Sequence, residues 1–252
     1  MPTALITGAT AGIGAAFARR LAADGHRLVL VARDEPRLDD LAGEMHERHG
    51  APAEGKHEVL PADLATAEGR AVVEQRLRDG AAPVDMLVNN AGIGSVGTFW
   101  DTDAEALNAQ FELGTTAVFR LTRAALEGMV ERDRGAVLTV ASFAGLLAGR
   151  NGASYTAAKT YAVSLSAEIA AELRGTGVQA MAVCPGWTHT ELHQRSGSDC
   201  PEDSSAWWLE ADEVVDTALR DLARGRTRSV PGRRYRLLLA AVDAMPHAFT
   251  RR

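Results

Sequence analysis

Short, continuously apolar runs alternate with helix-length segments along most of the chain. The runs expected to form strands are 3–7, 27–32, 57–61, 84–89, 135–141, 178–184 and 227–231. The segments expected to form helices are about 12–24, 34–49, 66–79, 103–131, 153–174 and 211–224. Strands that are apolar throughout are typical of a sheet covered on both faces. The regular alternation predicts right-handed βαβ crossovers, and therefore a doubly wound α/β fold around a parallel sheet.

The pattern contains no linker, internal repeat or low-complexity tract, so we expect residues 1–252 to form a single domain. The segment 191–210 is an exception, because it is polar and turn-rich until Trp207 and Trp208. It follows the carboxyl end of a predicted strand, where open parallel sheets bind ligands, and this favours a substrate lid at about 191–210. The alternative is a surface loop whose tryptophans cover a neighbouring helix.

Composition and charge exclude several classes of protein. The chain has 252 residues and is 46% hydrophobic, which excludes a disordered protein. Its formal net charge of −6 argues against general nucleic-acid binding. Two cysteines cannot form a disulfide framework, which indicates a reducing compartment. No apolar run reaches the roughly 20 residues that span a bilayer, and the first strand starts too early for a signal peptide, so we expect a cytoplasmic protein.

The charge is unevenly distributed along the chain. Residues 219–252 contain nine arginines and two aspartates, a local charge of +7. Such a basic end permits contact with nucleic acid, but an arginine-rich solvated face or a subunit contact is the favoured interpretation. The apolar run within 233–250 similarly permits peripheral membrane binding, although a buried or subunit-contact helix is favoured there.

A glycine-rich turn joins the first strand to the first helix, in the spacing G-x-x-x-G-x-G. Glycine permits the sharp turn and the close approach of a pyrophosphate, whose charge the start of the helix favours. This position in the fold indicates a dinucleotide site, with a plain tight turn as the alternative. The residues expected to line it are Gly8, Thr10, Gly12, Ile13 and Gly14.

The end of the second strand bears on the choice between NADP and NAD. Enzymes that prefer NAD usually place a carboxylate there for the ribose 2′-hydroxyl, whereas this chain has Ala32 followed by Arg33. The guanidinium of Arg33 suits a 2′-phosphate, so we expect NADP(H) to be preferred, with NAD as the alternative cofactor. The adjacent Asp34 weakens this reasoning unless it caps the next helix, and Arg33 could also be an exposed structural residue.

Turns after the third and fourth strands offer further contacts to the nucleotide. Asp63, followed by Leu64, could present a carboxylate to the adenine amino group. Asn90, Ala91 and Gly92 provide small residues where the chain would pass close to the ribose. Taken singly, each of these is also compatible with ordinary turn chemistry.

Tyr155 and Lys159 are four residues apart in a segment expected to be helical, so their side chains share one face. A phenol with a pKa of about 10 is a poor acid–base group at neutral pH, and a nearby ammonium would lower that pKa. Ser142 ends the fifth strand, where its hydroxyl could hold a carbonyl oxygen. The alternative is a surface Tyr–Lys contact. Only two of the 27 Lys and Arg residues are lysines. Because a bulky guanidinium is not interchangeable with a compact ammonium beside a phenol, the presence of a lysine at position 159 favours a catalytic role for the pair.

Taken together, these motifs resemble the short-chain dehydrogenase/reductase family in order and spacing. The matching segments are TGATAGIG at 7–14, NNAG at 89–92, Ser142, YTAAK at 155–159 and PGWTHT at 185–190. The resemblance implies a Rossmann-type seven-stranded sheet in the order 3-2-1-4-5-6-7. It also implies hydride transfer between a nicotinamide and the carbon of a ketone, aldehyde or alcohol. A homodimer or homotetramer is implied, and no metal.

The same resemblance implies roles for the site residues. Tyr155 would act as acid in reduction and base in oxidation, Lys159 would also bind the nicotinamide ribose, and Ser142 would orient the substrate. The segment 188–190, with Thr188 and Thr190, would hold the nicotinamide carboxamide, and Thr190 would reach toward the cofactor. Pro185 and Gly186 would also belong to the cofactor site. An apolar small-molecule substrate is suggested by Leu146, Leu147, Trp187, Trp207 and Trp208.

One position departs from the family pattern. The family usually has an asparagine, whose backbone carbonyl serves a proton relay, in the helix between the fourth and fifth strands, where this chain has Gly114. A glycine, which costs about 1 kcal/mol within a helix, could leave the same kink, so we expect the relay to survive.

The alternative function is a catalytically weak nucleotide-sensing or interaction protein on the same fold.

Overall fold

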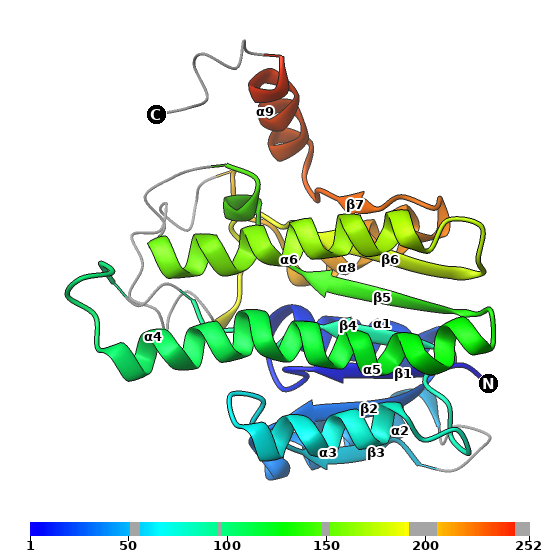
Figure 1. The fold of residues 1–252 in the computed structure, drawn as a ribbon. Coiled ribbons are helices and arrows are strands. Elements are labelled where there is room, and N and C mark those ends of the chain that lie inside the picture. Colours follow the sequence, from blue (N-terminus) through cyan, green and yellow to red (C-terminus); the bar gives the residue numbers. More distant parts are fainter. Residues whose placement is uncertain (51–55, 95–96, 148–151, 192–205, 245–252) are drawn as a thin grey trace.

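The predicted strands pair side by side in one parallel sheet, in the order β3-β2-β1-β4-β5-β6-β7. This order, which the family resemblance implied, is confirmed in a computed structural model that describes residues 1–50, 56–94, 97–147, 152–191 and 206–244. The strands are β1 Thr3–Thr7, β2 Arg27–Ala32, β3 Glu58–Pro61, β4 Met86–Asn89, β5 Gly135–Val140, β6 Val178–Val183 and β7 Arg228–Ser229. All strands therefore end at the same edge of the sheet (Figure 1).

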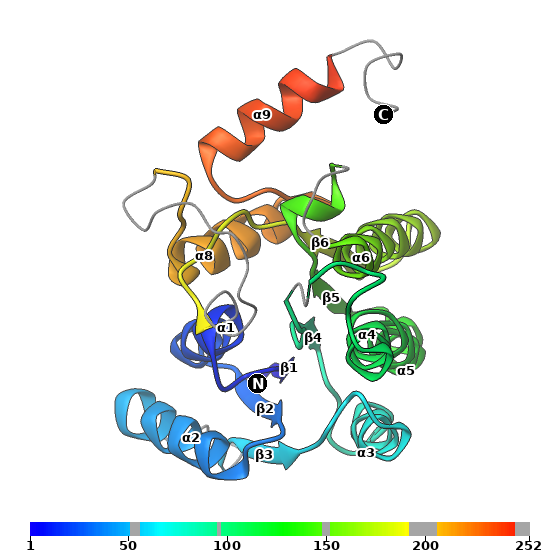
Figure 2. The same cartoon turned by 90° about the vertical axis from the view of Figure 1, so that its left-hand side faces the viewer.

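Helices cover both faces of the sheet, which makes three layers (Figure 2). One outer layer contains α1 (Gly12–Ala23), α2 (Glu35–His49) and α8 (Ala211–Ala223). The other contains α3 (Ala67–Leu77), α4 (Ala104–Phe111), α5 (Ala117–Glu131) and α6 (Ala153–Glu172). The helices within each layer pack on one another as well as on the sheet, α1 against α8 and α3 against α5.

Because helices cover both faces of the sheet, its strands are apolar throughout their length. Successive side chains of a strand point to opposite faces, so Leu28 and Leu30 lie in the core beneath α1, while Val29 and Val31 lie in the core beneath α3 and α5. All four are fully buried. Each such side chain contributes about 2 kcal/mol through removal from water, and a polar residue at either face would forfeit that contribution.

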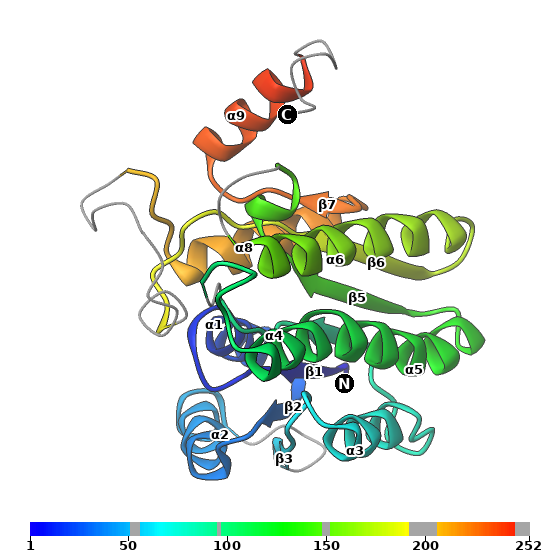
Figure 3. The same ribbon diagram turned by 60° about the vertical axis from the view of Figure 1, so that its left-hand side comes forward.

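The segment expected as one helix over 103–131 is interrupted at Gly114. It contains α4, a π-helical turn at Glu112–Thr116, and α5, which together form one continuous rod beside α6 (Figure 3). The interruption expected at Gly114 is therefore present. A Cβ atom at this position would lie 3.0 Å from the Cβ of Ala158 in α6, so the glycine also lets the two helices approach closely.

The last helix, α9 (Arg233–Asp243), stands apart from the three layers at the β7 edge of the sheet (Figures 1 and 2). It accounts for part of the apolar run expected to be helical. Residues 245–252 lie outside the described part of the chain, as do residues 192–205 of the predicted lid. Within the described ranges, no helix combines the length and apolar character that crossing a membrane requires.

Candidate active site

The glycine-rich turn between β1 and α1 is tightly folded. Gly8 and Gly12 have φ angles of +64° and +51°, in the left-handed region that favours glycine. A Cβ atom at Gly14 would lie 2.2 Å from the carbonyl oxygen of Gly8, so no side chain fits there. No side chain caps the start of α1, which leaves its first N–H groups facing the turn. These features fit the pyrophosphate of a dinucleotide.

Thr7 and Asn90 hold the glycine-rich turn against the end of β4. The Thr7 hydroxyl accepts hydrogen bonds from the backbone N–H groups of Asn90 (2.9 Å) and Ala91 (3.0 Å). The Asn90 side-chain amide donates to the carbonyl oxygens of Thr7 (2.9 Å) and Gly8 (3.1 Å). Asn90, expected near the ribose, thus engages the turn with its side chain. Thr7 was not predicted, although its position directly before Gly8 was an available signal.

Arg33 directly follows β2, and Arg37 lies in the first turn of α2. Arg33 is exposed, and in the described part of the chain no hydrogen bond or ion pair engages its side chain. Asp34 accepts the backbone N–H of Arg37 (3.2 Å), so it caps α2, and its carboxylate is committed to that role. Arg37, which was not predicted, donates to the Thr10 carbonyl (2.9 Å) and forms an ion pair with Glu191 (2.9 Å).

The turn after β3 places Asp63 and Leu64 at the same edge of the sheet. One carboxylate oxygen of Asp63 accepts the backbone N–H of Ala65 (3.0 Å), and Leu64 is buried. A Cβ atom at Gly69 would lie 2.1 Å from the Asp63 carbonyl oxygen. The start of α3 therefore packs directly on this turn and fixes it.

Ser142 and Tyr155 meet where β5 ends and α6 begins. Ser142 caps the short helical turn Phe143–Gly145, and its side chain shares a hydrogen bond with the phenol of Tyr155. A Cβ atom at Gly145 would lie 2.7 Å from the backbone carbonyl of Lys159, so this glycine allows α6 to approach the Ser142 turn. Gly145 was not predicted, because its role depends on an approach between separate elements.

Lys159 completes the group. Its ammonium donates a hydrogen bond to the Val140 carbonyl oxygen (2.8 Å) and lies 5.8 Å from the centre of the Tyr155 ring. A Cβ atom placed on Gly92 would be 3.6 Å from this ammonium, so Lys159 reaches the turn after β4. The structure thus brings Ser142, Tyr155 and Lys159 together next to the predicted ribose position.

Burial dominates the protonation of both titratable groups. It raises the pKa of the Tyr155 phenol, and the hydrogen bond with Ser142 opposes that shift. Burial also lowers the pKa of Lys159 to about 8. The expectation that Lys159 would lower the pKa of Tyr155 is therefore wrong for this structure. The ammonium is directed at the Val140 carbonyl oxygen, and the largest cause of the upward shift is burial of the phenol.

The segment 185–190 runs from the Ser142 turn to the glycine-rich turn. The Pro185 carbonyl accepts the backbone N–H of Phe143 (2.8 Å). At the other end, a Cβ atom on Gly12 would lie 2.8 Å from the Thr190 methyl carbon. Thr188 is 2% exposed and donates its hydroxyl to the Gly186 carbonyl (3.0 Å), so its side chain serves the turn itself.

Aromatic side chains form a wall beside this segment. The rings of Trp187 and Trp208 are 6.0 Å apart, and His189 stacks on Trp208 at 4.6 Å. Leu146 and Leu147 are partly buried against the same core as Trp187. His189 was not predicted as part of this wall. In the described ranges, no cluster of His, Cys, Asp and Glu is arranged to hold a metal ion.

Comparison with known proteins agrees with this geometry. Residues 2–201 match the family model for short chain dehydrogenases. The D-beta-hydroxybutyrate dehydrogenase of Cupriavidus necator is 36% identical over 196 residues, which cover 77% of this chain and 73% of that protein. A short-chain dehydrogenase from Sphingobium yanoikuyae, solved in complex with NADPH, is 36% identical, with a TM-score of 0.86 over 98% of both chains. A bulky-bulky ketone specific alcohol dehydrogenase from Comamonas testosteroni is 32% identical, with a TM-score of 0.81 over 98% and 96% of the two chains.

Proposed function

The chain belongs to the short-chain dehydrogenase family of oxidoreductases, and from this premise we propose that it interconverts a ketone or aldehyde and the corresponding alcohol with NADP(H). The observation that carries the proposal is the meeting of Ser142, Tyr155 and Lys159 at the carboxyl edge of the sheet. A hydroxyl, a phenol and an ammonium in this arrangement can hold a carbonyl oxygen and exchange a proton with it.

The residues present fit a dinucleotide. The glycine-rich turn would hold the pyrophosphate, because no Cβ atom fits at Gly14. Arg33 would bind the 2′-phosphate, and the Asp63–Leu64 turn the adenine. The ribose would lie beside Lys159 and the Asn90–Gly92 turn, and the segment 185–190 would hold the carboxamide. When bound, the nicotinamide supplies or accepts the hydride.

The side chains supply the proton chemistry. In reduction, Ser142 donates a hydrogen bond to the substrate oxygen and Tyr155 gives that oxygen its proton; in oxidation, Tyr155 takes the proton back. Because burial raises the pKa of Tyr155, the phenol is protonated at neutral pH and can act as the acid in reduction. Lys159, with a pKa of about 8, is charged at neutral pH and stabilises the phenolate when it forms.

We further propose an apolar substrate and a homodimer or homotetramer. The wall of Trp187, His189 and Trp208 supports the first proposal, and the bulky ketones named for the Comamonas testosteroni relative agree with it. Phe111 and Phe119, on the α4–α5 rod, are 54% and 52% exposed and support a contact between subunits.

Incubation of the purified protein with NADPH and a panel of aliphatic, cyclic and aryl ketones and aldehydes tests the reaction directly. We expect NADPH oxidation, followed at 340 nm, with at least one class, and slower oxidation when NADH replaces NADPH. Aryl and cyclic ketones should exceed small aliphatic ones because of the aromatic wall. Absence of turnover with both cofactors across the panel would contradict the proposed function.

Arg33→Ala tests the cofactor preference. We expect KM for NADPH to rise about tenfold or more, because one charge-assisted contact to the 2′-phosphate is lost. KM for NADH should change less than about twofold, because NADH lacks that phosphate. Arg48→Ala is the matched control, since Arg48 is exposed on α2 and pairs only with Glu44 among the described residues. An equal change for both cofactors, or none, would show that Arg33 does not read the 2′-phosphate.

A further inference from the structure

Tyr235 connects the last helix with the segment that follows β6. It lies in the first turn of α9 and is 4% exposed. The face of its ring covers Gly186 so closely that a Cβ atom on Gly186 would lie 1.8 Å from the Tyr235 Cζ atom. The two residues fit together only because position 186 carries no side chain, so any larger residue there would displace the ring.

The Tyr235 hydroxyl makes two hydrogen bonds with the backbone. It accepts a hydrogen bond from the backbone N–H of Trp187 (2.9 Å) and donates one to the backbone carbonyl of Trp207 (2.7 Å). The Trp187 carbonyl in turn accepts the N–H of Leu209 (2.8 Å). One side chain therefore fixes the segment 186–189 against the segment 206–209, which carries part of the aromatic wall.

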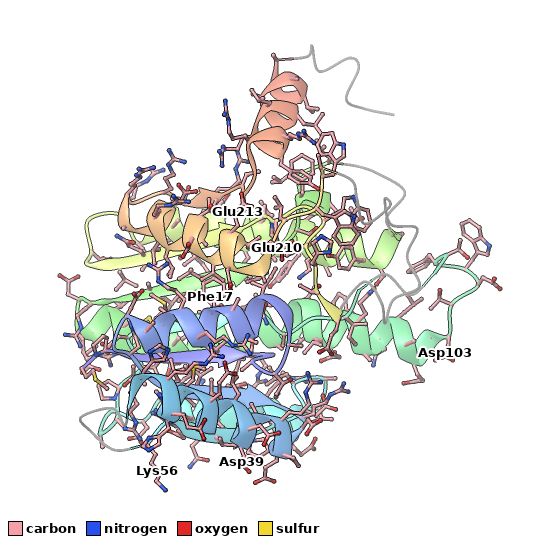
Figure 4. The ribbon with its side chains drawn as sticks, turned by 180° about the vertical axis from the view of Figure 1, so that it is seen from behind. Phe17, Asp39, Lys56, Asp103, Glu210 and Glu213 are labelled. Carbon is pink, nitrogen blue, oxygen red and sulfur yellow. The ribbon has the colours of Figure 1, made fainter. Side chains whose placement is uncertain are left out.

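The Tyr235 ring also contacts aromatic residues near the proposed catalytic residues Ser142, Tyr155 and Lys159. Phe143 lies edge-on at 4.9 Å and Trp207 at 5.4 Å between ring centres. Phe143 directly follows Ser142, and its backbone N–H is bonded to the Pro185 carbonyl. Figure 4 shows ring-bearing side chains gathered between the start of α8, near Glu210, and the first turns of α9. Tyr235 thus sits between the Ser142 turn and the segment proposed to hold the carboxamide.

We propose that Tyr235 is a positioning residue for the nicotinamide end of the cofactor site. This inference rests on the proposed function, in which the segment 185–190 holds the carboxamide. Tyr235 acts through the backbone of Gly186 and Trp187, which it holds by ring packing and by its hydroxyl. It makes no contact with the glycine-rich turn or Arg33 among the hydrogen bonds and ring contacts of the described residues. Its effect should therefore be confined to one end of the dinucleotide.

Tyr235→Phe keeps the ring and removes only the hydroxyl. Calorimetric titration would compare NADPH with 2′-phospho-ADP-ribose, which has the same adenine end and no nicotinamide. We expect Kd for NADPH to rise about tenfold, as for loss of a buried hydrogen-bond partner, and Kd for 2′-phospho-ADP-ribose to stay within about twofold. Arg33→Ala should give a different pattern, because it should raise Kd for both ligands alike. Tyr161→Phe should change neither Kd.

A variant that binds NADPH like the wild type, or that weakens both ligands equally, would overturn the inference. If Tyr235→Phe does not fold, Phe143→Leu removes one ring contact of Tyr235 and is measured in the same way. It should weaken NADPH alone by about threefold, and an unchanged affinity would be equally decisive against the inference.

The outcomes separate this inference from the proposed function. If the wild-type protein binds NADPH but reduces no carbonyl, the proposed function is contradicted. The role of Tyr235 in binding is then still decided by the same titration of NADPH and 2′-phospho-ADP-ribose. An active wild type whose Tyr235→Phe variant binds NADPH normally contradicts only the role of Tyr235. If NADH proves to be the preferred cofactor, NADH and ADP-ribose replace the phosphorylated pair, with the same expected difference.

Discussion

Tyr155→Phe is expected to lower kcat by about 10²- to 10⁴-fold, the range that a positioned general acid contributes, while Kd for NADPH stays within about twofold. The variant keeps the ring and its packing and removes only the proton that the substrate oxygen would receive. Because Ser142 keeps its place as the cap of the Phe143–Gly145 turn, the substrate can still bind. Steady-state NADPH oxidation gives kcat, and calorimetric titration gives Kd.

Tyr161→Phe is the matched control for this variant. Tyr161 lies in the same helix, is only partly buried, and has no lysine four residues further on. Its loss of a hydroxyl should leave kcat and Kd unchanged. A Tyr155→Phe variant with wild-type turnover would show that another group supplies the proton. Loss of NADPH affinity in parallel with kcat would instead indicate that the phenol serves mainly to hold the cofactor.

The sequence was sufficient for the sheet and for the motifs at its carboxyl edge. Strands that are apolar on both faces require two helical layers, and Leu28 and Val29 lie on opposite sides of the sheet as that requirement predicts. Most of the proposed site residues lie within a few positions of a strand end, whereas Tyr155 and Lys159 lie on α6. Because parallel strands end at one edge, prediction of the strands already placed Ser142, Asn90 and Gly8 together.

Contacts between segments distant in sequence could not be predicted in this way. Arg37 reaches Glu191, 154 positions later, and Tyr235 covers Gly186, 49 positions earlier. Neither pair belongs to a local motif, and each depends on how closely two finished elements approach. The direction of the Tyr155 pKa shift could not be predicted for a similar reason. Burial of the phenol depends on the whole surrounding structure, whereas the sequence shows only its spacing from Lys159.

Lys159→Arg is expected to lower kcat by about 100-fold, because the stabilisation of the phenolate by a well-placed ammonium is lost. The ammonium occupies a narrow place between the Val140 carbonyl and Gly92. A bulky planar guanidinium cannot take the same position as the compact ammonium, although it keeps the charge. The variant therefore separates the geometry of the cation from its presence, which a substitution by alanine or methionine would not do.

The pH profile makes this prediction specific, and Lys56→Arg is its matched control. Since burial lowers the pKa of Lys159 to about 8, the wild-type ammonium is present below that pH and lost above it, so kcat for reduction should fall as pH rises through about 8. In Lys159→Arg the guanidinium stays charged, so this step near pH 8 should vanish from the residual activity. Lys56, which points outward at the end of the molecule near β3 (Figure 4), should be replaceable without any change in kcat or in the profile. A fully active Lys159→Arg enzyme with an unchanged alkaline step would show that the proton chemistry does not depend on this ammonium.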